Sequence, residues 1–247
     1  MPSLMLQRST LPPPPPLAEL KRPSLFLDFD GTLVEIAAEP DGITVDALLG
    51  GRLEALAARL DGRLAVVTGR SIDNLTRFLG PVAFQLAGSH GSHVVGSRGE
   101  TLRTAEPLPD VIGRRLKEFA GQCGLLYECK AHGAALHFRS KPDLEDTAHS
   151  FVAELAEAHG LATKHGKCVV ELVRPGTGKG GAVELLMGQP IFAAATPIFL
   201  GDDVTDEDGM VAAARLGGFG IAVGERRFDQ ASYHLSTVKD VHKWLNL

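Results

Sequence analysis

The 247-residue sequence lacks the features that mark several large classes of protein. No apolar run approaches the roughly 18 residues needed to span a membrane, and the amino-terminal stretch lacks the short apolar core of a secretion signal. No cluster of lysine and arginine occurs, and the net charge is −5, whereas nucleic-acid-binding proteins usually carry a basic face. We therefore expect a cytoplasmic protein that binds neither nucleic acid nor membranes.

Cysteine is scarce as well. The three cysteines, Cys123, Cys129 and Cys168, are an odd number without the spacing of a metal or redox pair, so we expect reduced thiols. Hydrophobic residues make up 44% and charged residues 22%, which is a globular composition. The length suits one α/β domain, or a core with a smaller inserted domain.

Residues 1–22 contain the unbroken proline run Pro12–Pro16. Proline lacks a backbone donor and favours an extended polyproline conformation. This composition predicts a disordered, solvated tail.

From Pro23 onward, short apolar runs that end in polar residues alternate with helical segments, which is typical of an α/β fold with a parallel sheet. Four such runs stand out: Leu25–Leu27, Leu64–Val67, Ile198–Leu200 and Ile221–Val223. Apolar residues recur every three to four positions from Leu49 to Leu60, which predicts a helix packed on the sheet. Ser71 can cap a further helix, and Thr205 one that begins near Asp206.

The middle of the chain has a different pattern. Leu125–Lys130 and Ala134–Arg139 are typical of paired strands, a helix is expected over Asp143–His159, and another hairpin is expected around Gly166-Lys167. We therefore predict a parallel core over 23–104 and 175–247, interrupted by an α+β cap over 105–174.

The first strand ends in Asp28-Phe29-Asp30-Gly31. Ligands bind at the carboxyl ends of strands in an open parallel sheet, so both carboxylates should lie where a substrate binds. One could attack as a nucleophile while the other acts as acid and base. A solvated turn or a calcium loop could also carry such residues, but the later glutamate of a calcium loop is absent.

Two other strand ends carry polar groups. Thr68-Gly69-Arg70 presents a hydroxyl and a backbone amide that can hold a phosphoryl oxygen, although this pattern alone is common. Gly201-Asp202-Asp203 precedes Asp206 and Glu207. So many carboxylates repel one another unless a cation neutralises them, and oxygen ligands suit Mg²⁺.

Lys179 stands at the start of a helix in Gly178-Lys179-Gly180. The segment superficially resembles a nucleotide-binding loop, but Val173 and Gly180 stand where that motif needs Gly and Ser or Thr. The helix dipole disfavours a lysine there, which favours a phosphate partner over an idle surface charge.

Together, these motifs resemble in order and type the four motifs of the haloacid dehalogenase superfamily. The resemblance implies that Asp28 is the nucleophile and Asp30 the general acid and base, with Thr68 and Lys179 holding the phosphate. It implies that Asp28, Asp202 and the backbone carbonyl of Asp30 bind Mg²⁺, supported by Asp203 and Asp206. Two aspartates in the first motif favour a phosphatase over a dehalogenase.

The predicted cap carries three charged residues of interest. Glu128 and Lys130 share one face of a strand, and Glu171 interrupts an apolar run. Sugar hydroxyls could satisfy all three groups. A surface ion pair accounts for Glu128 and Lys130 equally well.

The segments Gly88–Gly91, Glu128–Lys130 and Gly166–Pro175 resemble the trehalose-6-phosphate phosphatase family. The resemblance implies that the cap residues hold the sugar, with Gly69, Arg70 and His90 as further substrate-binding residues. It implies hydrolysis of trehalose 6-phosphate. We also expect a monomer with a functional link to a trehalose-phosphate synthase. Alternatives are a phosphatase for sucrose phosphate or a mannosyl compound, a non-catalytic sugar-phosphate sensor, and a phosphotransferase or mutase.

Overall fold

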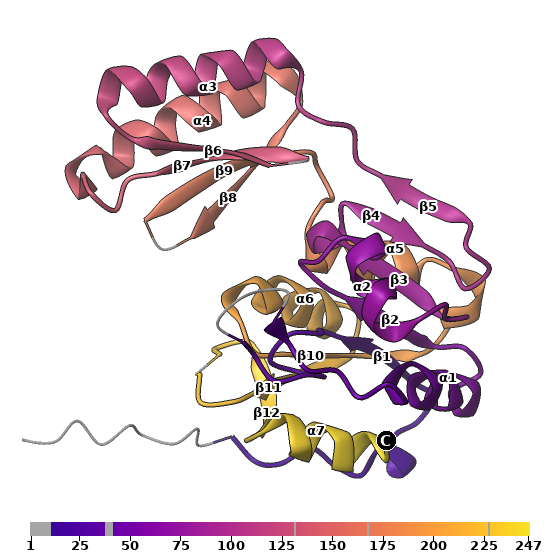
Figure 1. Ribbon diagram of the computed structural model, residues 1–247. Helices are drawn as coiled ribbons and strands as arrows, with labels where there is room; N and C mark the ends of the chain where they lie inside the picture. Colours follow the sequence, from indigo (N-terminus) through magenta and orange to yellow (C-terminus); the bar gives the residue numbers. More distant parts are fainter. Residues whose placement is uncertain (1–10, 38–41, 131, 167, 227) are drawn as a thin grey trace, which may run out of the picture. The chain divides into compact units, whose positions relative to one another are not determined.

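The computed structural model describes residues 11–37, 42–130, 132–166, 168–226 and 228–247, which divide into two units (Figure 1). The larger unit, which we call the core unit, lies within Met1–Arg103 and Gly178–Leu247. The smaller, the cap unit, is Thr104–Thr177. Each has its own hydrophobic core, as expected of an independent compact unit.

The core unit is built on an eight-stranded sheet in the order β12-β11-β10-β1-β2-β3-β4-β5. The strands are β1 (Pro23–Leu27), β2 (Leu64–Val67), β3 (Gln85–Gly88), β4 (His93–Val95), β5 (Thr101–Thr104), β10 (Thr196–Gly201), β11 (Phe219–Val223) and β12 (Ala231–Leu235). The run from β12 to β3 is parallel, and β4 pairs antiparallel with β3. The expected α/β fold with a mostly parallel sheet is confirmed.

Helices cover both faces of this sheet because its central strands are apolar on both faces. In β1, Leu25 and Leu27 pack with α1 (Leu49–Arg59), α2 (Ile72–Leu79) and α7 (Val238–Leu245). Phe26, on the opposite face, packs with α5 (Lys179–Met187) and α6 (Val204–Arg215). The alternation of side chains along one strand therefore produces a three-layer sandwich (Figure 1).

The four apolar runs of the sequence form neighbouring strands, β11-β10-β1-β2. Ser71 caps α2 as expected, accepting a hydrogen bond from the Asn74 backbone N at 3.2 Å. The expected cap of α6 is wrong, because its N-cap is Asp203, two residues before Thr205. A carboxylate that accepts from the first-turn backbone fills that role.

The proline-rich segment differs from the expected solvated tail. Residues 1–10 lie outside the described residues, but from Leu11 onward the segment contacts the core unit. Trp244 Nε1 donates to the Pro15 carbonyl at 2.8 Å, and the His234 backbone N donates to the Pro12 carbonyl at 3.0 Å. A polyproline stretch has no internal hydrogen bonds, so its free carbonyls can accept donors from the folded core.

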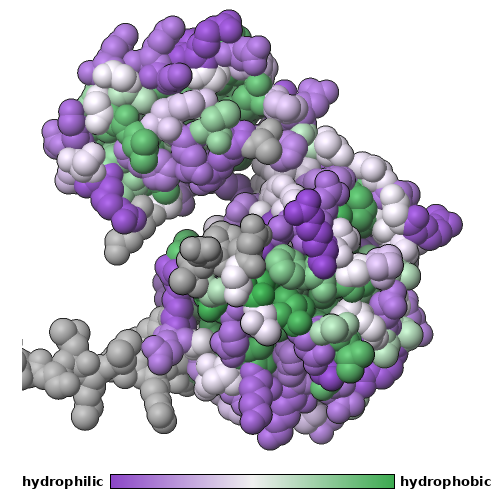
Figure 2. Space-filling view, viewed as in Figure 1, coloured by the Kyte–Doolittle hydropathy of each residue, from purple (hydrophilic) through white to green (hydrophobic). Residues whose placement is uncertain are grey.

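The cap unit is a four-stranded antiparallel sheet packed against two helices. The elements are α3 (Asp110–Cys123), β6 (Leu126–Lys130), β7 (Gly133–His137), α4 (Glu145–His159), β8 (Ala162–Gly166) and β9 (Val169–Val173), with the sheet in the order β6-β7-β9-β8. Both helices lie on one face of the sheet (Figure 1). Their apolar residues face the sheet, whereas the outward surface of α3 is mostly hydrophilic (Figure 2).

Candidate active site

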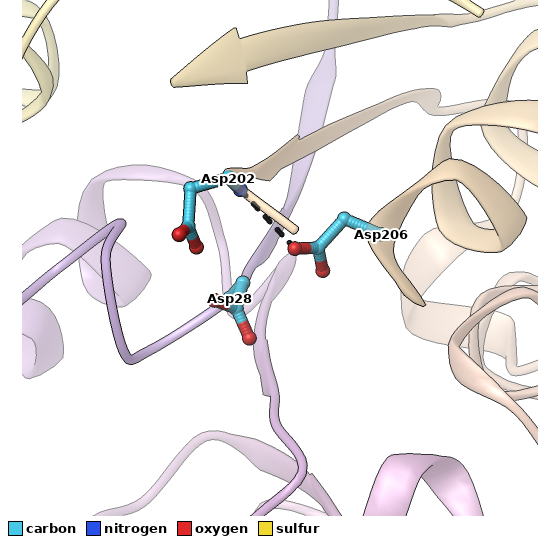
Figure 3. Close-up of side chains that lie close together, drawn as sticks. All are labelled: Asp28, Asp202 and Asp206. Carbon is cyan, nitrogen blue, oxygen red and sulfur yellow. Dashed lines mark hydrogen bonds between the residues drawn. The ribbon is translucent and has the colours of Figure 1, made fainter. Parts of the chain in front are cut away.

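Three carboxylates gather at the carboxyl ends of two neighbouring strands. Asp28 follows β1, Asp202 follows β10, and Asp206 lies in the first turn of α6. Because β1 and β10 pair in parallel, with Leu27 opposite Leu200, both strands deliver an aspartate to the same edge. One carboxylate oxygen of each aspartate lies within 4.8 Å of the others (Figure 3).

Lys179, the first residue of α5, joins two of these carboxylates. Its Nζ donates to Asp28 Oδ1 and to Asp206 Oδ1, both at 2.6 Å, and all three side chains are almost completely buried. Burial lowers the pKa of Lys179, but the two carboxylates outweigh that effect and the net shift is upward. The ammonium therefore remains charged in the buried site.

The three carboxyl groups hold protons more tightly than isolated aspartates do. Burial raises the pKa of Asp28 and of Asp202 from 3.8 to about 6, although Lys179 opposes the shift in both. Burial and the neighbouring Asp28 raise the pKa of Asp206 to about 7, again against Lys179. One ammonium does not neutralise three carboxylates, and this surplus of negative oxygens is the donor set that a hard divalent cation requires.

The turn between β10 and α6 fixes Asp206. Its Oδ2 accepts from the backbone N of Asp203 at 2.9 Å and of Asp202 at 3.1 Å. Asp203 caps α6 in return, and its exposed carboxylate lies 3.1 Å from Arg226 Nη1. Among the described residues, Asp203 is therefore a structural cap and not a member of the three-carboxylate group.

Gly31 permits the approach of Asp202 to the first strand. Its φ is +80°, and a Cβ at this position would collide with the Asp202 carboxylate. A glycine tolerates this conformation and leaves the required space.

Asp30 has a different partner from Asp28. Arg70 donates from Nε to Asp30 Oδ2 and from Nη2 to Asp30 Oδ1, both at 2.7 Å, and from Nη1 to Asn74 Oδ1 at 2.8 Å. Such a two-pronged contact fixes a carboxylate in both position and orientation. Arg70, expected to bind substrate, holds Asp30 in this structure.

Thr68, Gly69 and His90 meet at one turn beside this pair. The buried Thr68 hydroxyl accepts from the Arg70 backbone N at 3.2 Å, and the His90 backbone N donates to the Thr68 carbonyl at 2.9 Å. A Cβ at Gly69 would lie 2.7 Å from the His90 ring. Thr68 and the expected substrate-binding residues of the core unit therefore lie close together in the fold.

The cap unit brings its three expected residues onto one sheet face. Glu128 and Glu171 both pair in register with Ala135 of β7. Lys130 Nζ lies 2.5 Å from Glu171 Oε1, and Glu128 Oε2 lies 2.8 Å from His137 Nε2. These charged residues occupy the face opposite the packed helices.

Two residues that contact the expected site residues were not singled out from the sequence. His137 lies two positions beyond Ala135 in β7, so strand alternation would have placed it on the charged face. Asn74 lies in the first turn of the helix capped by Ser71, four residues after Arg70. No motif marks it, because its contact depends on how Arg70 turns toward Asp30.

Fold and site together define the class of protein. A mostly parallel sheet with aspartates at the adjoining ends of two strands, a buried lysine and an inserted α+β unit agrees with the resemblance of the sequence motifs to the haloacid dehalogenase superfamily. A solved haloacid dehalogenase-like hydrolase from B. subtilis shares the fold, with a TM-score of 0.63 at 16% identity, over 91% of this chain and 99% of that one.

The sequence comparisons are more specific. The trehalose-phosphatase family profile matches residues 26–236. Over 229 residues the chain is 39% identical to the trehalose-6-phosphate phosphatase of Escherichia coli (strain K12), covering 90% of this chain and 85% of that protein. A solved trehalose-6-phosphate phosphatase related protein is 29% identical, with a TM-score of 0.56, over 90% of this chain and 95% of that one. The chain belongs to the trehalose-phosphatase family.

In the part of the chain that the structure describes, none of the helices combines the length and the apolar character needed to cross a bilayer.

Proposed function

We propose that the protein hydrolyses trehalose 6-phosphate to trehalose and phosphate through a phosphorylated Asp28. The observation that carries the proposal is the arrangement of buried Asp28, Asp206 and Lys179 with half-buried Asp202 in a chain of the trehalose-phosphatase family. Phosphate-monoester hydrolysis requires accelerations of up to about 10²¹-fold, obtained mainly by positioning and charge neutralisation.

In the first step, Asp28 attacks phosphorus. Lys179 binds Oδ1 of Asp28, which leaves Oδ2 to form the new bond to phosphorus. The bond from phosphorus to the sugar oxygen breaks, and that oxygen takes the proton of Asp30, which enters this step in its protonated form. Asp30 then accepts a proton from the water that attacks phosphorus, which releases phosphate and regenerates the Asp28 carboxylate.

Arg70 supports a second part of the proposal. Its two-pronged contact with Asp30 fixes the orientation of the acid and base before a substrate binds. We assign Arg70 a positioning role for Asp30 rather than direct contact with sugar. Thr68, the backbone amide of Gly69 and Lys179 hold the phosphoryl oxygens, and His90 lies against Gly69.

The carboxylate group fits Mg²⁺ because its donors are all oxygens and their negative charge exceeds that of Lys179. Asp28, Asp202 and the backbone carbonyl of Asp30 would hold the ion, with Asp206 and Asp203 fixing the turn beside it. When bound, Mg²⁺ neutralises charge on the transferring phosphoryl group.

Sugar recognition is assigned to Glu128, Lys130 and Glu171 of the cap unit. Each is already paired, Lys130 with Glu171 and Glu128 with His137, and each pair is partly exposed. Hydroxyl groups can both donate to the carboxylates and accept from the ammonium. We further propose a cytosolic monomer whose substrate comes from a trehalose-phosphate synthase.

The test is phosphate release from trehalose 6-phosphate, glucose 6-phosphate and sucrose 6-phosphate, each with and without Mg²⁺. We expect the highest kcat/KM with trehalose 6-phosphate and loss of turnover without the ion. Equal kcat/KM for the three sugar phosphates would overturn the assignment of trehalose 6-phosphate as the substrate. The proposed mechanism at Asp28 would still stand. Binding without turnover, even with Mg²⁺, would identify a sensor.

A further inference from the structure

The core unit contains a cavity that the proposed reaction does not use. Its volume is about 970 Å³, which lies in the range of small-molecule sites. One wall is the proline-rich segment from Pro13 to Leu20, and the other comes from α7 and the end of α1. None of its lining residues belongs to the carboxylate group, to the Asp30 pair or to the turn at His90.

The proline-rich wall is fixed in place. The hydrogen bonds from Trp244 to Pro15 and from His234 to Pro12 hold it at two points, and Leu17 packs against the main hydrophobic core. Proline has little conformational freedom to lose when a ligand binds. The wall is therefore a preformed surface that a ligand can meet without ordering a loop.

The lining combines buried leucines with four basic residues, three of which are exposed. Leu56, Leu60 and Leu245 line the cavity from the buried core, next to the indole of Trp244. The basic residues of the lining are Arg22, Arg59, Arg63 and Lys243.

Most of these cations have no carboxylate to neutralise them. Arg63 pairs with Asp61, but the salt bridges among the described residues include none to Arg22, Arg59 or Lys243. The one acidic residue of the lining, Asp240, accepts from the Thr237 hydroxyl at 2.8 Å. A local excess of positive charge in a chain of net charge −5 attracts an anion to this place rather than to the surface in general.

We propose that this cavity binds an amphiphilic anion, with an apolar ring or chain against Trp244 and the leucines and an acidic group beside Lys243. The apolar lining of the cavity selects the apolar part of the ligand. The cations without a carboxylate partner select its negative charge. A neutral molecule of the same shape would gain only the apolar contacts.

The test uses two probes that share the same aromatic frame and differ by one sulfonate group: anilinonaphthalene sulfonate and its uncharged relative N-phenylnaphthylamine. Trp244 is the single tryptophan of the chain and lines the cavity, so energy transfer from it to the bound probe reports binding near this site. Titration of the full chain should give saturable transfer to the sulfonate at one probe per chain. Higher salt should weaken the binding of the sulfonate, because it screens the charges, and should leave the binding of the neutral probe unchanged.

Lys243→Gln should raise the Kd of the sulfonate about threefold, as expected for loss of a partly exposed ion pair. The Kd of the neutral probe should stay the same within error. Lys239→Gln is the matched control, because Lys239 lies on the same helix but does not line the cavity. Equal sulfonate affinity in the two variants, a preference for the neutral probe, or transfer that never saturates would each overturn the proposal.

Discussion

Lys179 lies at the electrostatic centre of the site because its ammonium is the partner of two buried carboxylates. Removing one member of a buried charged group leaves the others uncompensated, which typically costs about 3 to 5 kcal/mol. The size of that cost depends on whether Asp28 and Asp206 are ionised, and their raised pKa values, about 6 and about 7, place the change near neutral pH.

We therefore predict that Lys179→Met lowers the free energy of unfolding by about 3 kcal/mol at pH 8 and by much less at pH 5. At pH 5 both carboxyl groups are largely protonated, so little uncompensated charge remains after the substitution. Urea unfolding of the metal-free chain at the two pH values measures this. An equal loss of unfolding free energy at pH 5 and at pH 8 would show that the pKa values of Asp28 and Asp206 are not raised.

At Arg70, geometry and charge can be separated by a substitution that keeps the charge. Arg70→Lys retains a cation beside Asp30 but removes the two-pronged contact. We predict that kcat falls at least about tenfold with little change in KM, because a misplaced acid and base slows the chemical step. Steady-state kinetics with trehalose 6-phosphate measure kcat and KM of this variant. Arg77→Lys, at an exposed position of α2, is the control. A raised KM at unchanged kcat would assign Arg70 to substrate binding instead.

At the scale of elements, the turn into α6 connects helix stability to the site, because Asp203 caps the helix while Asp206 turns back to Lys179. We predict that Asp203→Ala lowers the free energy of unfolding by about 1 kcal/mol. Thr205→Ala should change it by less than about 0.5 kcal/mol, since Thr205 is not the cap. Chemical denaturation of both variants distinguishes the two positions, and a larger effect at Thr205 would contradict the structure.

The elements that could be predicted from sequence were those with a strong local signal. Apolar runs marked β1, β2, β10 and β11, because central parallel strands are apolar on both faces. β3 and β12 carried weaker signals, since Gln85-Leu86-Ala87-Gly88 and Ala231-Ser232-Tyr233-His234-Leu235 mix polar residues or glycine into the run. The proline-rich segment could not be placed, because its anchors, Trp244 and His234, are far away in sequence.

The candidate site was predictable to a similar degree. Its aspartates and Lys179 follow strands or begin helices, so topology alone brings them to one edge of the sheet. The contact of Arg70 with Asp30 and the capping role of Asp203 depend on side-chain geometry, which motif spacing does not encode.

At the scale of the whole molecule, the carboxylate group couples stability to pH and, through the proposed Mg²⁺ site, to a divalent ion. Between about pH 4 and pH 7 the unfolded chain releases these protons while the folded chain keeps them, so folding stability falls as pH rises through this window. A cation that binds the ionised carboxylates offsets the loss. Its stabilising effect should therefore be small at pH 5 and large at pH 8.

We predict that saturating Mg²⁺ raises Tm by several degrees at pH 8 and by little at pH 5. Thermal unfolding followed by circular dichroism measures both values. Asp202→Asn is the control, because it removes one charged oxygen ligand and should remove most of the shift at pH 8. A shift that is independent of pH or of Asp202 would place the ion elsewhere.

The central claim is that Asp28 bonds covalently to phosphorus. The most direct measurement is acid quenching during turnover of trehalose 6-phosphate with Mg²⁺, borohydride reduction of any acyl phosphate, and mass spectrometry of the peptide that contains Asp28. We predict conversion of Asp28 alone to homoserine, dependent on substrate and absent when turnover is blocked by omitting Mg²⁺. Full turnover with Asp28 unmodified, or reduction at a different aspartate, would contradict the account.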